Sequence, residues 1–358
     1  MIKKQNKNLV IYIVSDKKNA QFRYRVANPI DACKKSRKWQ ATFYTKEDIN
    51  RLYKNLPEAK LLIIERQTSK NSEIPNLIKF AHTQGIKVLF DLDDLIFDFR
   101  DLPLLMRSTK GRNVCYWIGY FAGIRRVAKK VDGFIVTNNF LARKISRSFK
   151  KPVAIIPNSL NTSQIKVSKK YLKTKLDKKD FTLGYFSGSP THIKDFRLVE
   201  PEIIRFLEDH DNASLIVVGY MKFSSRAKKL IKTGRIKFEP PVDYLKLQEK
   251  ITKVDVNIAP LLVNDFTNCK SELKFFEAAI VETTTIASPS YTFKKAITDG
   301  KNGFLAQPGE WYKKLEYLYS HPEENKKIAK KAKEYSLKHY YGEEFLKEVE
   351  GVYDYFAK

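Results

Sequence analysis

Lys270, Lys274 and Glu277 are the residues whose types and spacing point most directly to chemistry. They fall at positions i, i+4 and i+7, so a helix would place all three on one face. Ser271 is a suitable N-cap, and apolar residues recur at helical spacing on the other face: Leu273, Phe276 and Ile280. Helix amides and two cations suit a diphosphate, and a carboxylate accepts hydrogen bonds from two neighbouring hydroxyls. The pattern therefore favours a nucleotide site; the alternative is a solvated surface pair that contributes roughly 0.3 kcal/mol.

A second candidate phosphate contact is the Gly/Ser-rich turn that follows the apolar run beginning at Phe181. Gly188, Ser189, His192 and Lys194 lie in or just after this turn. Such a turn lets backbone amides approach phosphate oxygens closely, so we expect the backbone and Lys194 to make the contact. His192 fits equally well as a turn residue. The sequence has no Gly-x-Gly-x-x-Gly fingerprint, which argues against a nicotinamide enzyme.

Apolar runs alternate with helical patterns along the chain, which predicts a parallel α/β fold as the scaffold of these candidate sites. The clearest runs are residues 9–15, 60–65, 131–138, 213–219 and 254–262. In an open α/β sheet, ligands bind at the carboxyl ends of the strands. Arg23 and Arg25, which follow the first run, are therefore candidates for phosphate or acceptor contacts.

Length and composition indicate an ordinary globular protein with two domains. The 358 residues allow two cores of roughly 150 residues each, and 43% of the residues are hydrophobic. No apolar run approaches the roughly 20 residues that span a bilayer, and we expect no secretory signal. The three cysteines, Cys33, Cys115 and Cys269, lack metal-ligand spacing, which favours a reducing cytoplasm.

The formal charge of +27 allows a nucleic acid, an anionic membrane or an acidic substrate as partner. The lysines are scattered and no nucleic-acid module accompanies them, so we expect no nucleic acid. An anionic membrane surface attracts exposed lysines and arginines. These considerations predict a cytoplasmic protein that associates peripherally with the inner face of the cell membrane.

The stretch from Asn268 to Ala279, followed by a β-branched strand that ends at Pro289, resembles the carboxy-terminal signature of retaining GT-B glycosyltransferases of family 4, the glycosyl transferases group 1. That signature reads Glu, seven residues, Glu. Glu277 matches the second glutamate, which in the family holds the donor's ribose. The first glutamate is replaced by Cys269, so the usual contact to the donor sugar needs a substitute among three neighbours: Asn268, Lys270 and Glu272.

Other segments resemble this family in the same order. Residues 152–161 are similar to the end of its first domain, with Ser159 in place of a glycine. Residues 235–244, which include Pro240, resemble the loop where the nucleobase rests, and residues 254–262 resemble the strand before the donor helix. The loop from Gln21 to Asn28 lacks the frequent Gly-Gly and is similar to a subset associated with polysaccharide and rhamnan assembly.

The resemblance implies two Rossmann-like domains whose parallel sheets face a central cleft. The first would span residues 1–162, with a carboxy-terminal helix over 340–358 that packs back on it. A link over 163–180 would lead to the donor domain, residues 181–339. The implied reaction transfers a sugar from a nucleoside-diphosphate sugar to a hydroxyl of a glycan or lipid-linked glycan, with retention of configuration, in the synthesis of cell-surface polysaccharide. Neither a metal nor another cofactor is expected.

Site residues follow from the resemblance and the patterns together. The catalytic candidates are Lys194, Lys270 and Lys274, which would stabilise charge on the departing diphosphate, and Asp93, which would contact the transferred sugar or the acceptor hydroxyl. Those for binding the donor are Gly188, Ser189, His192, Pro240, Asn268, Ser271, Glu272 and Glu277. Those on the acceptor side are Arg23, Arg25, Asp91 and Asp94.

The acidic run Asp91, Asp93 and Asp94 also supports a different class of enzyme. An apolar strand that ends in Phe-Asp-Leu-Asp resembles the first motif of haloacid-dehalogenase-type phosphohydrolases, in which Asp91 would be the nucleophile and Asp93 the acid/base, with magnesium. That motif normally continues Gly-Thr, whereas Asp94 and Leu95 follow here. Another interpretation is that these residues cap the next turn. A further alternative is a non-catalytic, basic protein that binds polyanions.

Overall fold

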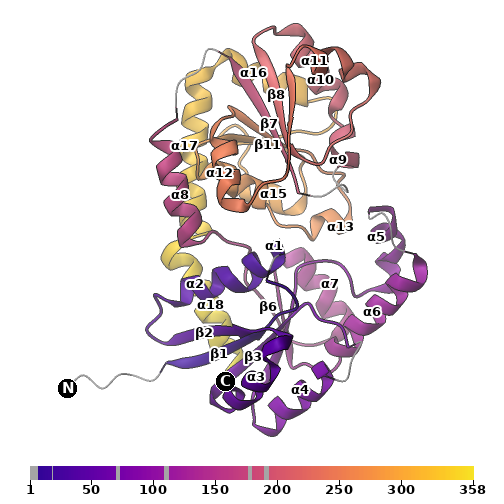
Figure 1. Cartoon of the computed structure of the whole chain (residues 1–358), viewed down its shortest axis with the longest axis vertical. Coiled ribbons are helices and arrows are strands. Elements are labelled where there is room, and N and C mark those ends of the chain that lie inside the picture. The colour runs from indigo at the N-terminus through magenta and orange to yellow at the C-terminus, as the bar shows by residue number, and fades with distance from the viewer. Residues whose placement is uncertain (1–6, 18, 70–72, 109–112, 176–179, 189–192) are drawn as a thin grey trace, which may run out of the picture. The chain divides into compact units, whose positions relative to one another are not determined.

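The computed structural model describes residues 7–17, 19–69, 73–108, 113–175, 180–188 and 193–358 (Figure 1). The described residues form two compact units. The first unit comprises residues 1–161, 269–271 and 340–358, and the second comprises residues 162–268 and 272–339. In the described part of the chain, no helix is both long enough and apolar enough to cross a membrane.

The first unit is built on a six-stranded sheet with the order β2-β1-β3-β4-β5-β6. Each pairing between these strands is parallel. The strands are β1 (Asn8–Ile13), β2 (Trp39–Tyr44), β3 (Ala59–Glu65), β4 (Lys87–Leu92), β5 (Gly133–Val136) and β6 (Val153–Ile155). The helices are α1 (Ala20–Phe22), α2 (Asn28–Cys33), α3 (Ile49–Asn55), α4 (Glu73–Thr83), α5 (Leu102–Ser108), α6 (Val114–Ala128), α7 (Asn139–Phe149) and α18 (Gly342–Phe356). The central strands are buried on both faces, as their continuous apolar runs predict.

The second unit repeats this architecture with the order β12-β11-β10-β7-β8-β9, again parallel throughout. Its strands are β7 (Phe181–Ser187), β8 (Ala213–Gly219), β9 (Ile236–Glu239), β10 (Val256–Ala259), β11 (Thr284–Ala287) and β12 (Phe304–Leu305). Its helices are α8 (Thr162–Leu172), α9 (Ile193–Arg197), α10 (Glu200–Asp209), α11 (Lys228–Lys232), α12 (Tyr244–Thr252), α13 (Asp265–Asn268), α14 (Leu273–Ala279), α15 (Tyr291–Ala296), α16 (Trp311–Ser320) and α17 (Pro322–His339). The predicted α/β class with two parallel sheets is therefore confirmed.

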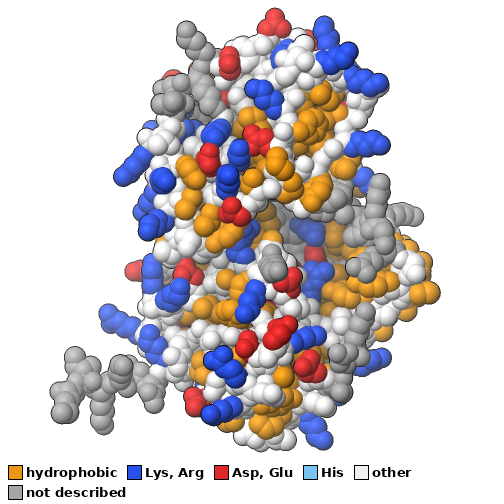
Figure 2. All heavy atoms as spheres, viewed as in Figure 1, with side chains coloured by type: hydrophobic (Ala, Val, Ile, Leu, Met, Phe, Trp, Pro, Cys, Tyr) orange, Lys and Arg blue, Asp and Glu red, His pale blue; other side chains and the backbone are white. Residues whose placement is uncertain are grey.

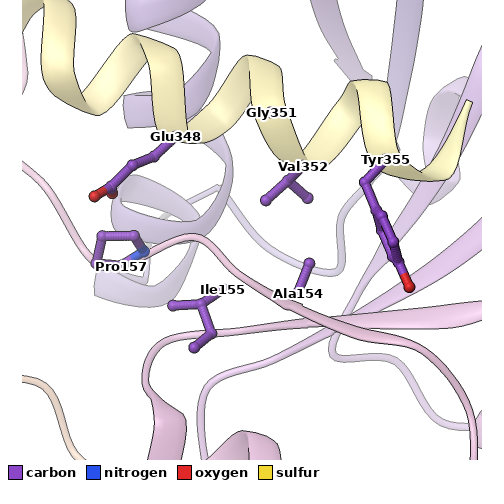
Figure 3. A pocket seen from close by; sticks show the side chains of 7 residues that line it. All are labelled: Ala154, Ile155, Pro157, Glu348, Gly351, Val352 and Tyr355. Carbon is purple, nitrogen blue, oxygen red and sulfur yellow. The ribbon is translucent and has the colours of Figure 1, made fainter.

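Helix α18 belongs to the first unit, although it comes last in the chain. Its apolar stripe lies in the same core as β1 and β3: Phe345, Val349, Val352, Tyr353 and Phe356. The hydroxyl groups of Tyr12 and Tyr353 form a 2.6 Å hydrogen bond inside that core. A largely apolar hollow of about 360 Å³ lies between α18 and edge strand β6, lined by Ile155, Val352, Tyr355 and their neighbours (Figure 3). Glu348 is its single ionisable carboxylate, so this hollow offers little chemistry.

The segment over 163–180, predicted to be a link between the two domains, is partly folded into the second unit. Its first part is helix α8 of the second unit, in which Gln164, Ile165 and Ser168 are buried. Ser168 donates a 3.2 Å hydrogen bond to the side-chain oxygen of Gln248 on α12. Lys166 lies between these buried residues, and Lys169 and Lys170 follow Ser168, so the helix has a buried face although the sequence of the stretch is strongly basic. Residues 176–179 lie outside the described part.

Candidate functional site

Glu277 and Lys274 are held in the second unit by the short helix α14. This helix packs against β10, β11, α12 and α17, and its residues from Phe275 onward are buried. The helix begins at Leu273, one residue later than an N-cap at Ser271 predicts. Glu272 occupies the N-cap position without a side-chain hydrogen bond, so the predicted cap by Ser271 is wrong. Tertiary packing places the start of α14, and no local cap is needed.

The Glu277 carboxyl is buried rather than solvated, with 4% of its surface exposed. Its Oε1 accepts a 3.3 Å hydrogen bond from Nε2 of Gln164 on α8. A buried carboxylate is costly unless hydrogen bonds compensate for the lost water. This burial removes the alternative interpretation that Glu277 belongs to an ordinary surface pair.

The Lys274 ammonium lies 4.9 Å from the centre of the Tyr185 ring, in a cation–π contact with strand β7. Its Nζ has no hydrogen-bond partner among the described residues. Burial lowers the pKa of Lys274 to about 8, against the opposing influence of Asp195 and Glu277. A buried cation of this kind costs free energy that a bound anion would offset.

Two residues that the sequence did not single out position this site. Asp195 on α9 is 8% exposed and accepts a 2.9 Å hydrogen bond from the amide of Leu262, after β10. Asn257 on β10 donates to the carbonyl of Lys274 and to the hydroxyl of Thr285, each at 3.0 Å. Asn257 thereby ties α14 to β10 and β11. A polar residue inside an apolar strand was the signal that could have marked Asn257.

Residues 269–271, which precede α14, group with the first unit. Cys269 is fully buried, and burial raises the pKa of its thiol. Its carbonyl accepts a 2.8 Å hydrogen bond from Asn138, and Ser271 accepts one of 3.0 Å from Asn158. In the second unit, Asn268 accepts from the amide of Tyr291 at 2.9 Å. Cys269 therefore fills a packing position. Ser271 does not cap α14, and its hydroxyl is engaged by Asn158.

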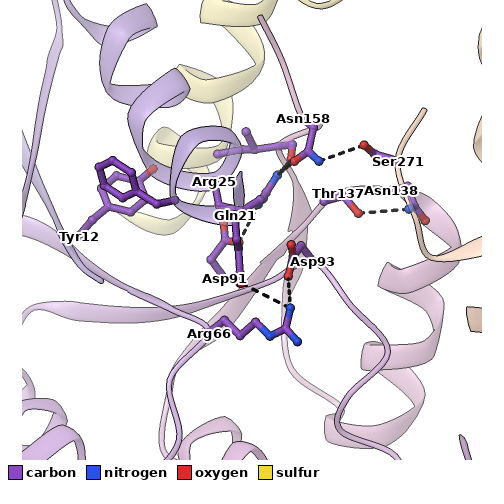
Figure 4. A network of polar contacts seen from close by, with 12 residues as sticks. Tyr12, Gln21, Arg25, Arg66, Asp91, Asp93, Thr137, Asn138, Asn158 and Ser271 are labelled. Carbon is purple, nitrogen blue, oxygen red and sulfur yellow. Dashed lines mark hydrogen bonds and ion pairs between the residues drawn. The ribbon is translucent and has the colours of Figure 1, made fainter. Parts of the chain in front are cut away.

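The network in Figure 4 corrects the expectation for Arg25 and Asp91. Nε and Nη2 of Arg25 donate to the two oxygens of Asp91 at 2.8 and 2.9 Å. Arg25 also donates to the carbonyl of Ile156 and to Asn158 at 2.6 and 3.1 Å. Each of the pair is 1% exposed, so they join the end of β4 to the chain after β6 instead of contacting a ligand. Burial raises the pKa of Asp91 to about 6 despite Arg25.

Asp93 and Asp94 share the guanidinium of Arg66, at 3.3 and 2.8 Å. Lys270 adds a 2.6 Å ion pair to Asp94. Burial favours the neutral form of Asp94, but Lys270 and Arg66 outweigh it and lower the pKa. Burial and the neighbouring Asp94 raise the pKa of Asp93. Lys270 is thus occupied by a carboxylate of the first unit, while Lys274 belongs to the second unit.

The remaining predicted residues are more exposed. Arg23 stacks on the ring of Tyr24, with 4.3 Å to its centre, and donates to its hydroxyl at 2.6 Å. Gly188 is exposed at the end of β7, as are Lys194 on α9 and Pro240 after β9. Ser189 and His192 lie outside the described residues. Among the described residues, no group of three or more His, Cys, Asp and Glu side chains is arranged to hold a metal.

Two parallel six-stranded sheets, each in an α/β unit, match the GT-B fold, and solved structures with that fold superpose on almost the whole chain. HepE of Anabaena, solved with UDP, has 12% identity and a TM-score of 0.64, covering 97% of this chain and 99% of its own. A glycosyltransferase from Rickettsia africae has 13% identity and a TM-score of 0.64, covering 99% and 100%. Sucrose-phosphate synthase from Thermosynechococcus elongatus has 13% identity and a TM-score of 0.63, covering 98% and 99%. At these identities the likeness establishes the fold.

The sequence carries a more specific similarity in its second half. Residues 181–321 match the profile of the family described as Glycosyl transferases group 1. No curated protein matches the chain in sequence. The matched segment contains α14 with Lys274 and Glu277, and also Tyr185 and Asp195. The profile match therefore falls on the unit that buries these charged residues.

Proposed function

We propose that this protein is a glycosyltransferase that moves a sugar from a nucleoside-diphosphate sugar to a hydroxyl of a glycan or lipid-linked glycan. The observation that carries the proposal is the pair of buried charges on α14, inside the segment that matches the glycosyltransferase profile. The Lys274 ammonium lacks a hydrogen-bond partner among the described residues and therefore suits a diphosphate. Glu277 supplies a buried carboxylate that can accept hydrogen bonds from two ribose hydroxyls.

The proposed chemistry is transfer with retention of configuration. The bond from the anomeric carbon to the diphosphate oxygen breaks while the acceptor oxygen bonds to the same face of that carbon. The departing diphosphate takes the acceptor proton. Lysines stabilise its charge, with Lys274 as the principal group and Lys194 and Lys270 as further candidates. Asp93 is the candidate contact to the transferred sugar or the acceptor hydroxyl.

A uridine nucleotide is the first donor to test. HepE has been solved with UDP-glucose, and a pneumococcal O-GlcNAc transferase with UDP and GlcNAc. The proposed acceptor is a precursor of a cell-surface polysaccharide, reached from the cytoplasm at an anionic membrane. The charge of +27 supports such a surface. Lysines and arginines occur at many separate places on the face shown in Figure 2, which favours diffuse attraction over a single basic groove.

The phosphohydrolase alternative is disfavoured by the Arg25–Asp91 pair. A nucleophilic carboxylate needs an oxygen that can approach the phosphorus atom. Arg25 engages both oxygens of Asp91, and the two side chains are 1% exposed. The polyanion-binding alternative predicts binding of polyanions without turnover of a nucleotide sugar, so an assay of donor turnover distinguishes it from the proposal.

The test is a hydrolysis and transfer screen with UDP-, GDP- and dTDP-sugars, using the full chain and anomeric proton NMR of the product. We expect one donor class to be consumed and the new linkage to keep the donor's anomeric configuration. Lys274→Met should abolish turnover, whereas Lys295→Met, on the exposed side of α15, should not. Turnover of no nucleotide sugar, or full activity of Lys274→Met, would overturn the proposal; an inverted linkage would overturn retention alone.

A further inference from the structure

A polar cavity of about 1010 Å³ lies in the second unit, at the amino ends of its strands. Phe181 begins β7, Asp255 precedes β10 and Glu282 precedes β11, and all three line the cavity. The end of α8 and helix α17, both labelled in Figure 1, supply the lysines of its wall. Its volume is at the upper end of the range of about 300–1,000 Å³ that is typical of small-molecule sites. Neither Lys274 nor Glu277 is among the described residues that line it, so it is separate from the candidate donor site.

Helix α17 presents a row of lysines to this cavity. Lys326, Lys330 and Lys333 fall at positions i, i+4 and i+7, so the helix places them on one face. Lys333 pairs with Glu282 at 2.8 Å, and Lys326 pairs with Glu323 at 3.1 Å. Lys330, between them, is exposed and has no ion pair or hydrogen bond with the described residues. Because like charges at this spacing repel one another, an anion beside Lys330 would stabilise the row.

The chain just after α8 brings two more lysines to the same cavity. Lys175 donates hydrogen bonds to the carbonyls of Val281 and Glu282, at 3.1 and 2.5 Å, which follow α14. Lys173 is exposed, and it too has no ion pair or hydrogen bond within the described part of the chain. Lys173 and Lys330 are therefore accessible cations that carry no structural contact, and they line one cavity from two different helical segments.

The rest of the wall combines aromatic rings with hydrogen-bond acceptors. The rings of Phe181 and Tyr319 meet edge to face, with 5.4 Å between their centres. The hydroxyl of Tyr319 donates a 2.8 Å hydrogen bond to Asn212, which fixes the orientation of the ring. Asp255, which also accepts from a backbone amide of β7 at 2.7 Å, is half-buried, and Asp180 is exposed. The wall therefore offers a flat apolar surface beside carboxylate oxygens that accept hydrogen bonds from hydroxyls.

Glu282 occupies a backbone position that normally belongs to glycine. The amide of Thr283 donates to the carbonyl of Ala278 at 3.1 Å, and that of Glu282 donates to Ala279 at 2.9 Å. These two bonds form the Schellman motif that ends α14, and its left-handed position usually carries glycine. Glu282 has a φ of 51° there, so the chain keeps a carboxylate in the cavity wall despite the steric cost of its side chain.

We propose that this cavity binds a phosphorylated sugar, at a site separate from the one that holds the sugar donor. Lys173 and Lys330 bind the phosphate group, because they are the accessible cations that other side chains leave uncompensated. The ring of Tyr319 packs against the apolar face of the sugar, and the carboxylates of Asp255 and Glu282 accept hydrogen bonds from its hydroxyls. The site does not depend on the proposed glycosyl transfer.

The test is calorimetric titration of the full chain with glucose 1-phosphate, glucose 6-phosphate and mannose 6-phosphate, compared with glucose, inorganic phosphate and UMP. We expect at least one sugar phosphate to bind about tenfold more tightly than glucose, phosphate or UMP. Replacing Lys173 and Lys330 together by Gln should weaken its binding by roughly ten- to a hundredfold, because charge-assisted hydrogen bonds are lost. Lys331→Gln is the matched control, because Lys331 is exposed on α17 and does not line the cavity.

Two further measurements separate this site from the donor site and from a structural role. Lys274→Met should bind the sugar phosphate as the wild type does, and loss of binding in that variant would place the ligand at the donor site and overturn the proposal. Without ligand, the double variant should unfold at the wild-type temperature or above it, because repulsion between lysines is relieved. A lower midpoint together with lost binding would indicate a structural role and overturn the proposal.

The ligand comparisons decide the remaining outcomes. Equal binding of sugar phosphates by the wild type and the double variant would refute the site, and so would equal affinity for inorganic phosphate and every sugar phosphate. Tighter binding of UMP would replace the sugar phosphate by a nucleotide and overturn the assignment. Binding of a sugar phosphate by a protein that turns over no nucleotide sugar would uphold this site while refuting the proposed transfer.

Discussion

At the scale of single residues, the molecule is distinguished by charged side chains that its fold buries. Glu277 and Lys274 lie on one short helix, and the hydrogen bonds from Gln164 and Asn257 fix that helix in place. Each charge costs free energy in the unliganded chain, and a nucleotide would compensate both. We therefore expect these two charged groups to strengthen ligand binding while they lower the stability of the fold.

Replacing Glu277 by Gln tests the ribose contact. We expect the donor to bind roughly ten- to a hundredfold more weakly, since a hydrogen bond to a charged group contributes about 1.5–3 kcal/mol. The dissociation constant of the donor nucleotide, measured by calorimetry, gives the answer. Glu323→Gln on α17 is the matched control, because its side chain is 78% exposed. Unchanged affinity in Glu277→Gln would remove the carboxylate from the site.

Lys274 predicts a dependence of nucleotide binding on pH. Burial lowers its pKa to about 8, so the free protein loses this cation above that pH and its affinity for a diphosphate should fall. Lys274→Arg keeps its charge and should flatten the profile between pH 7 and about 10. Dissociation constants for UDP across this range provide the measurement. A falling wild-type profile that Lys274→Arg reproduces would assign the titration to another group.

The lowered pKa of Lys274 should also make the free energy of unfolding depend on pH, in the direction opposite to that of nucleotide affinity. Between pH 8 and 10.5 the unfolded chain still holds a proton that the folded chain has released. The free energy of unfolding should therefore rise with pH in this window, relative to Lys274→Met. Chemical denaturation of both proteins at several pH values checks the difference. A fall in the difference across this window would show that the folded chain stabilises the charged lysine.

At the scale of elements, the ends of the strands require particular backbone geometry. Gly219 ends β8 with a φ of 105°, and a Cβ there would lie 2.0 Å from the carbonyl oxygen of Ser187. Gly219→Ala should therefore lower the free energy of unfolding by roughly 3 kcal/mol or more. At Gly188, a Cβ meets no described atom within 4 Å, so Gly188→Ala is the control. Equal stability of the two variants in denaturant would contradict this account.

Helix α18 is anchored to the first sheet by polar contacts inside an apolar core. Tyr353→Phe leaves the buried hydroxyl of Tyr12 without its 2.6 Å partner and should cost about 1–3 kcal/mol. Tyr355→Phe removes the same atom two residues later, from a side chain that is 55% exposed, and should cost almost nothing. Urea unfolding followed by circular dichroism compares the two. Similar costs would indicate that the Tyr12 hydroxyl finds another partner.

At the scale of the whole molecule, the charge of +27 predicts association with anionic membranes. Sedimentation with vesicles that contain phosphatidylserine should fall strongly between about 50 and about 500 mM NaCl, because salt screens exposed charges. Vesicles of phosphatidylcholine alone are the control. Donor turnover should persist at the higher salt concentration, because buried pairs are screened less. Turnover that disappears together with vesicle binding would favour a polyanion-dependent activity.

Several features were predictable because they depend on local periodicity. Apolar runs such as 9–15 and 213–219 predicted buried parallel strands, and Glu277 was identified by its spacing within a helical stretch. The paired state of Arg25 and Asp91 was not predictable. Their contact joins the helical segment after β1 to β4, and the strand order β1-β3-β4 brings these segments together.

The amino-acid sequence by itself determined the class of fold and the segment that carries the glycosyltransferase similarity, because the alternation of apolar and polar residues is a local property of the chain. Only the tertiary structure decided which charged side chains are paired with one another and which can bind a ligand. Arg25 and Asp91 neutralise each other, Lys270 meets Asp94, and Lys274 keeps an ammonium without a hydrogen-bond partner in the described part. The physical reason is that the partner of a buried charge comes from an element distant in the chain, and only the packing of the sheets and helices brings it within reach.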